Sequence, residues 1–123
     1  MEPNQFVEKL KKAQELMKKE NYKDAKNLID QLKVIERDGD FDYSLTHQLY
    51  QLDSNVSSLL NQTTLLKYLN NVKKTQESIT FEELLKLTKN DLNLDLGILQ
   101  REIELLILRG VITYKIDGNR LIF

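Results

Sequence analysis

The spacing of the apolar residues changes at Gly110, and this change constrains the fold more than any other feature of the sequence. Apolar residues recur at helical spacing from Leu96 to Arg109, and Gly110 follows them as a glycine typical of a helix end. From Val111 onward apolar and polar residues alternate, which predicts a strand. Asp117-Gly118-Asn119 then predicts a turn into a last strand, Arg120–Phe123. We therefore expect an apolar helix followed by a β-hairpin.

Two registers of this hairpin are compatible with its turn. A loop formed by Gly118-Asn119 places Ile116 opposite Leu121, whereas moving the loop back by one residue places Lys115 opposite Arg120. We favour the first register, because like charges directly opposite each other destabilise a strand pair.

Helical spacing also covers most of the residues before the hairpin. Residues 4–19 and the stretch from about Ala25 to Ile35 each carry one apolar stripe, so we expect two antiparallel helices. Gly39 ends the second helix, and leucines from Leu45 onward predict a third. Residues 61–64 lack apolar side chains and form either a short join or a continuous helical passage.

A further helix is expected to start at Thr80, because Thr80 and Glu83 match a capping box and follow a short extended piece at Ile79. The order helix, strand, helix, helix and hairpin is that of a winged helix-turn-helix. We therefore expect a mainly α fold. Residues 4–62 are expected to form an antiparallel, TPR-like array of helical hairpins, and residues 63–123 a winged-helix module with a two-stranded wing.

Composition argues against an enzyme. The 123 residues include no cysteine and one histidine, His47, which leaves no thiolate chemistry and no recognisable triad or zinc site. Acidic residues in 38–42 and 91–102 approach the spacing of a calcium loop, but both segments lack its glycine at the sixth position. The four glycines are scattered and form no phosphate-binding loop. We expect no catalytic residue, no cofactor and no metal.

The sequence also predicts a cytoplasmic protein without a membrane segment. Its first residues contain no apolar signal region, and no window approaches the roughly 18 apolar residues of a membrane span. The absence of cysteine fits a reducing compartment.

The helix expected at Leu96–Arg109 has two apolar faces. One face enters the module's own core, and the other carries Ile98, Leu105 and Leu108. A DNA-reading helix presents Arg, Lys, Asn or Gln outward and avoids carboxylates, whereas this helix contains two glutamates. Packing of the second face against the preceding helices is the simpler account, and a partner-binding patch is the alternative.

The stretch from Ile79 to Asp117 contains a capped helix after a short strand, a helix that ends Glu104-Leu-Leu-Ile-Leu-Arg-Gly110, and the hairpin start Val111-Ile-Thr-Tyr-Lys-Ile-Asp117. On these elements it resembles the winged-helix half of the PCI family, which includes scaffold subunits of the proteasome lid, the COP9 signalosome and a translation initiation factor. In that family antiparallel helical repeats precede the winged helix, and residues 4–60 match one and a half such hairpins. Family members typically carry longer arrays, so the resemblance implies a minimal or truncated form. The end of the wing is also similar to the winged helix of the ufmylation adaptor.

The resemblance implies a non-enzymatic scaffold or adaptor subunit that acts through protein contacts, and the net charge of −1 agrees with this. Winged helices of the family often associate side by side through their hairpin strands, which implies self-association through the last strand as an open edge. The expected partner-binding residues are those of the second apolar face and of the last strand: Ile98, Leu105, Leu108, Arg120, Leu121, Ile122 and Phe123.

Two nucleic-acid functions stay open as alternatives. An RNA- or ribosome-associated factor would use the lysine-rich residues 9–33, although interleaved acidic residues favour a plain solvated face there. The net charge disfavours both functions, because affinity for nucleic acid comes mainly from basic groups that face phosphates. A DNA-binding regulator would read DNA with residues of the apolar helix and of the wing: Gln100, Arg101, Lys115, Asn119 and Arg120.

Overall fold

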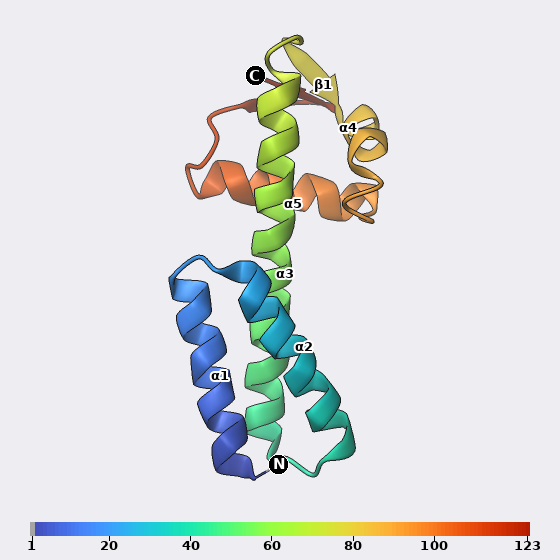
Figure 1. The fold of residues 1–123 in the computed structure, drawn as a ribbon. Coiled ribbons are helices and arrows are strands. Elements are labelled where there is room, and N and C mark those ends of the chain that lie inside the picture. The colour runs from blue at the N-terminus through green and yellow to red at the C-terminus, as the bar shows by residue number, and fades with distance from the viewer. Residues whose placement is uncertain (1) are drawn as a thin grey trace. The chain divides into compact units, whose positions relative to one another are not determined.

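The computed structural model describes residues 2–123, which form five helices and three short strands (Figure 1). The fold is mainly helical with a small antiparallel sheet, as the sequence predicts. The chain divides into two compact units, Met1–Leu60 and Asn61–Phe123, which we call the N-terminal and C-terminal units. In chain order the elements are α1 (Pro3–Lys18), α2 (Tyr22–Asp38), α3 (Tyr43–Val72), β1 (Ser78–Thr80), α4 (Phe81–Thr88), α5 (Leu96–Leu108), β2 (Lys115–Asp117) and β3 (Arg120–Ile122).

Helix α3 belongs to both units. It runs from Tyr43 to Val72 without a break, so residues 61–64 are a continuous helical passage rather than a join. Neither Gly nor Pro interrupts this stretch, and helical residues on both sides keep the backbone hydrogen bonds in register. The first part of α3 contributes Leu49 and Val56 to one core, and the last part contributes Leu65 and Leu69 to another.

The N-terminal unit packs α1, α2 and the first part of α3 around an apolar core. Figure 1 shows α1 and α2 running antiparallel, as their apolar stripes predict. The turn between them ends α1 with Glu20 in the left-handed region, at φ 60°. The core consists of residues at helical spacing on each helix: Phe6, Leu10, Ala13, Ala25, Ile29, Leu32, Leu49 and Val56.

A charged cluster joins α2 to α3 in this unit. The Asp53 carboxylate accepts hydrogen bonds from the ammonium groups of Lys26 at 2.7 Å and Lys33 at 3.0 Å. Burial alone would raise the pKa of Asp53, but the hydrogen bonds from the two lysines outweigh it, and the pKa lies below its usual value. Burial would likewise lower the pKa of Lys26, but Asp53 and Asp30 raise it above the ordinary 10.5.

The C-terminal unit surrounds the last part of α3 with α4, α5 and the sheet. Its core combines side chains from every one of these elements, including Leu69 of α3, Leu84 of α4, Ile103 of α5 and Leu121 of β3. The N-terminus of α4 is capped as predicted, because the Thr80 hydroxyl accepts from the Glu83 backbone N–H. The Thr80 hydroxyl also donates to the Glu83 carboxylate at 3.0 Å, so Glu83 meets the hydroxyl of Thr80 rather than the backbone N–H expected in a capping box.

The three strands are antiparallel and lie in the order β1-β3-β2. Ile116 pairs with Leu121 and Lys115 with Ile122, which confirms the favoured register of the hairpin. The ring of Tyr114 also meets that of Phe123 edge to face, with centroids 5.0 Å apart.

Strand β2 is shorter than the alternating pattern predicts. Residues 111–114 form no strand, because the backbone N–H groups of Val111 and Ile112 turn back to the Leu106 carbonyl at the end of α5. Ile112 is nevertheless buried in the core. The alternation from Val111 thus reflects burial of one side of an irregular segment.

Candidate functional site

Helix α5 carries the apolar face that the sequence singles out; its glycine end is as predicted, and its start is fixed by a side-chain cap. The Asp95 side chain caps the start by accepting from the Ile98 backbone N–H at 2.8 Å. At the other end Gly110, at φ 72°, donates to the Ile107 carbonyl, while Val111 donates to that of Leu106. This paired arrangement is the Schellman motif, in which a left-handed glycine ends the helix.

The second apolar face of α5 is only partly exposed. Leu108 is 81% exposed, whereas Ile98 and Leu105 are half-buried. At 100° per residue these three positions lie within about 80° of one another on the helix. Within residues 2–123, none of the three belongs to the core of the C-terminal unit, whose α5 members are Leu99, Ile103 and Leu106 together with the partly buried Leu96 and Ile107.

Glu102 lies on the core side of α5 and is only 1% exposed. Its carboxylate accepts from the Gln62 amide at 3.0 Å, and its other oxygen lies 3.6 Å from the Arg101 guanidinium. Arg109 in turn donates to the amide oxygen of Gln62. The pattern of the helix predicts Glu102 among its outward polar residues, and this prediction is wrong: position 102 lies three residues after Leu99 and four before Leu106, next to the core positions. These contacts satisfy a carboxylate that would otherwise destabilise the unit.

The residues proposed to read DNA are divided between two elements. On α5, Gln100 is half-buried and Arg101 is exposed beside Glu102. In the hairpin, Lys115, Asn119 and Arg120 are exposed.

The hairpin residues do not form a purely basic surface. Lys115 and Arg120 share one face of the sheet with Asp117 and Ile122, since alternate residues of a strand point the same way. The Arg120 guanidinium also donates to the Ser78 hydroxyl at 3.1 and 3.2 Å. The carboxylate of Asp117 opposite Arg120 disfavours a phosphate at this face.

The expectation that Arg120–Phe123 forms an open edge is wrong. Strand β3 is the central strand and pairs with β1 on one side and β2 on the other. Leu121 is fully buried, and Phe123 is half-buried with its backbone N–H donated to the Glu77 carbonyl. Of the last-strand residues, only Arg120 and Ile122 present exposed side chains. The sheet's outer edges are β1 and β2.

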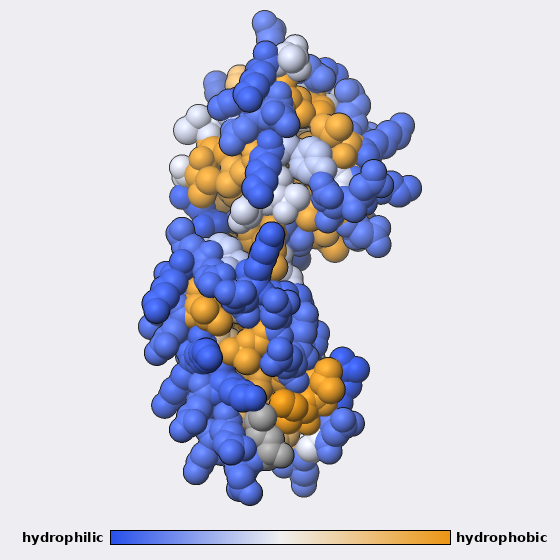
Figure 2. All heavy atoms as spheres, in the orientation of Figure 1, coloured by the Kyte–Doolittle hydropathy of each residue, from blue (hydrophilic) through white to orange (hydrophobic). Residues whose placement is uncertain are grey.

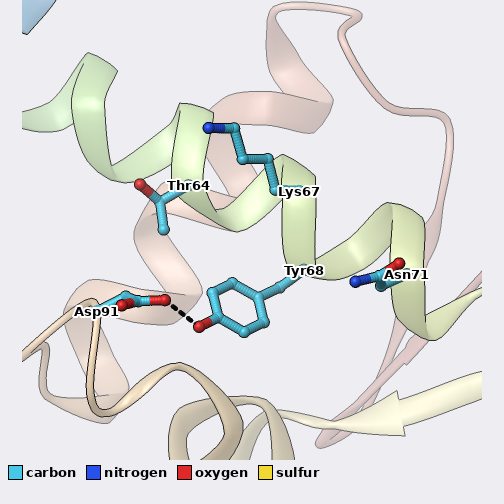
Figure 3. A pocket seen from close by; sticks show the side chains of 5 residues that line it. All are labelled: Thr64, Lys67, Tyr68, Asn71 and Asp91. Carbon is cyan, nitrogen blue, oxygen red and sulfur yellow. Dashed lines mark hydrogen bonds between the residues drawn. The ribbon is translucent and has the colours of Figure 1, made fainter.

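A polar pocket of about 560 Å³ opens on the C-terminal unit (Figure 3). Its lining consists of Thr64, Lys67, Tyr68 and Asn71 of α3, and Asp91 of the turn after α4. We call it the Tyr68 pocket. The Tyr68 hydroxyl donates to the Asp91 carboxylate, and this hydrogen bond raises the pKa of Tyr68, because ionisation would remove the shared proton beside a negative charge. This pocket was not predicted; its signal in the sequence is a polar stripe at helical spacing, on the side of α3 away from Leu65 and Leu69.

The acidic residues near calcium-loop spacing have other contacts in the structure. Asp91 binds Tyr68, Asp95 caps α5, and Glu102 is buried against Gln62. His47 is exposed on α3 and stacks with Tyr43. Across residues 2–123, no group of three or more histidine or acidic side chains is placed to hold a metal ion.

The face of the molecule drawn in Figure 2 is largely hydrophilic and shows apolar side chains in separate spots. Two of the lysines in the lysine-rich stretch, Lys26 and Lys33, are held by Asp53 rather than free to meet phosphates. No helix in the described part of the chain has the length and apolar character needed to cross a bilayer. Comparison of the chain with known protein families, with curated proteins and with solved structures finds no match in any of the three.

Proposed function

We propose that the chain is a non-enzymatic scaffold or adaptor of the cytoplasm that joins a larger protein complex through its C-terminal unit. In this proposal the C-terminal unit is a winged helix of the PCI type, and the N-terminal unit is a short TPR-like helical array. The order α3, β1, α4, α5, β2 and β3 supports the winged helix, in which β2 and β3 form the wing and α5 is the third helix.

The exposed Leu108 side chain carries the proposal. A leucine that is 81% exposed on the third helix gains roughly 1.5–3 kcal/mol when a partner buries it. Glu104, exposed on the same helix, would be repelled by phosphates, so the outward face of α5 suits a protein better than a nucleic acid. Ile98 and Leu105 extend the apolar contact, and Arg120 and Ile122 add an exposed patch on the sheet.

Affinity capture with matched variants tests the proposal. The wild-type chain, Leu108→Glu and Leu87→Glu are used as baits in extracts of cells that express the protein, with mass spectrometry as the readout. Leu87 is a half-exposed leucine of α4 and serves as the control, since it lies outside the α5 face. We expect specific partners to be captured by wild type and Leu87→Glu, and to be lost with Leu108→Glu.

Nuclease treatment separates this function from the nucleic-acid alternatives. Partners retained after treatment support direct protein contacts, whereas partners lost on treatment support a bridge of DNA or RNA. A shift of duplex DNA at low salt that Arg120→Ala abolishes would favour the winged-helix regulator instead. Equal capture by wild type and Leu108→Glu would contradict the assigned surface.

A further inference from the structure

The Tyr68 pocket holds one positive and one negative side chain that do not neutralise each other. Lys67 comes from α3 and Asp91 from the facing turn (Figure 3). Within residues 2–123 no ion pair joins them, and the Lys67 ammonium has no hydrogen-bond partner. Both charges are therefore available to a ligand.

The Tyr68–Asp91 hydrogen bond orients the acidic wall of the pocket. The Tyr68 hydroxyl occupies one oxygen of Asp91, which leaves the second oxygen to accept from a ligand. The Thr64 hydroxyl and the Asn71 amide also line the pocket, and neither side chain bonds to another residue of the described chain. Donors and acceptors are thus present along one wall, with a carboxylate facing them.

We propose that the Tyr68 pocket binds a dipolar ligand, whose cationic group contacts Asp91 and whose carboxylate contacts Lys67. A ligand with a single charge is attracted by one wall and repelled by the other, whereas a dipolar ligand is attracted by both. The volume of about 560 Å³ lies within the range of small-ligand sites, and the polar lining favours a polar occupant. This chemistry occurs in a free α-amino acid and in a polypeptide segment with neighbouring basic and acidic side chains.

Backbone amide shifts of the full-length chain measure binding directly. The dipolar probes are L-alanine, which carries both charges at its backbone, and acetyl-Lys-Glu-amide, which carries them on side chains. Acetyl-Lys-amide and acetyl-Glu-amide are the single-charge controls. We expect a dipolar probe to shift amides of residues 64–71 and of Asp91 with a Kd on the order of 1 mM, and the single-charge probes to bind about tenfold more weakly.

Charge-neutral variants test the two walls separately. Lys67→Gln and Asp91→Asn are each expected to weaken the dipolar probe about tenfold, which corresponds to the loss of one charged contact. Lys86→Gln and Asp117→Asn, at exposed positions outside the pocket, are the matched controls and should bind as wild type does. The dispersion of the amide spectrum shows whether each variant is folded.

The results with the two dipolar probes distinguish the two ligand classes. Binding of L-alanine alone identifies a free amino acid as the ligand class, and binding of the blocked dipeptide alone identifies side chains of a polypeptide. The proposal is overturned if no probe shifts the pocket amides, if single-charge probes bind as tightly as dipolar ones, or if the two pocket variants bind like wild type. Leu108→Glu should leave probe binding unchanged, so this site and the proposed α5 surface stand or fall independently.

Discussion

At the scale of single residues, backbone conformation and local charge decide where substitutions act. Glu20 and Gly110 both occupy the left-handed region at the end of a helix. Glycine adopts this region without a steric cost, whereas other L-residues lose about 1 kcal/mol or more there. The turn between α1 and α2 therefore contains a strained residue, and the turn after α5 does not.

Replacing Glu20 by glycine should stabilise the protein. Glu20 has φ 60°, where its side chain crowds the backbone. Glu20→Gly removes this steric cost and should raise the free energy of unfolding by about 1 kcal/mol. Chemical denaturation of wild type and variant measures the difference. Lys19→Gly is the matched control, because Lys19 has φ −84° and gains nothing from glycine, so that variant should be neutral or less stable.

The Asp53 cluster makes stability depend on acid pH. Because the pKa of Asp53 is lowered in the folded state, its contribution is complete above the ordinary aspartate pKa and is lost as pH falls through the lowered value. Asp53→Asn should reduce the free energy of unfolding at pH 7 by about 1–2 kcal/mol, between the values for exposed and buried pairs. The difference in free energy of unfolding between wild type and Asp53→Asn should become smaller below about pH 4.

Denaturation curves recorded from pH 7 to pH 2 check this expectation. Asp30→Asn is the control, because Asp30 pairs with Lys26 at 3.0 Å but its side chain is 52% exposed, so its loss should change stability little. A constant gap between wild type and Asp53→Asn across this pH range would contradict the role given to the Asp53 carboxylate.

At the scale of elements, a buried polar contact joins the last part of α3 to α5. Removing one partner takes this hydrogen bond away from the other, buried side chain, and the loss of a buried hydrogen bond costs about 1–3 kcal/mol. Glu102→Ala and Gln62→Ala are therefore each expected to destabilise the C-terminal unit by at least this amount. Gln62→Leu with Glu102→Leu should be far less destabilising than the sum of the two single leucine variants, because both polar groups leave together.

A double-mutant cycle of the two leucine substitutions, followed by thermal unfolding, measures this coupling. Effects that simply add would show that Gln62 and Glu102 act independently. Glu104→Ala serves as a control, because Glu104 is exposed and lies about 160° around α5 from Glu102, where it should not couple to Gln62.

The elements were predictable wherever their signals are local. The Thr80 cap, the glycine end of α5 and the register of the hairpin each depend on a few neighbouring residues, and all three are as predicted. The central position of β3 was not predictable in this way, since β1 is a strand of only three residues that pairs with residues 40 or more positions later in the sequence. Pairing so distant depends on how the intervening helices pack, which apolar spacing does not encode.

The residues of the candidate site show the same contrast between local signals, which were predictable, and contacts between distant residues, which were not. Exposure of Leu108 follows from its position opposite the core face of α5, so sequence spacing locates it. The Tyr68 pocket depends on bringing Asp91 to a helix that lies more than 20 residues earlier in the chain. The burial of Glu102 was not predicted, because a charged residue is expected at the surface even where its helical position lies beside the core.

At the scale of the whole molecule, the two units have separate cores. Leu84 is fully buried in the core of the C-terminal unit, so Leu84→Ala should cost about 2–5 kcal/mol there. We expect amide hydrogen exchange to accelerate from about Asn61 onward while α1 and α2 keep their protection. Leu10→Ala, in the other core, should produce the converse pattern, and uniform acceleration in both variants would indicate one cooperative unit.

The sharing of α3 between two cores has a consequence for the order of synthesis. When the first part of α3 leaves the ribosome, α1 and α2 have already been made and can cover Leu49 and Val56 at once. Leu65 and Leu69, by contrast, must wait until β3 has been translated before their core is complete, which takes several seconds at about 5–20 residues per second. For that interval the nascent chain exposes the apolar side of the end of α3 to solvent.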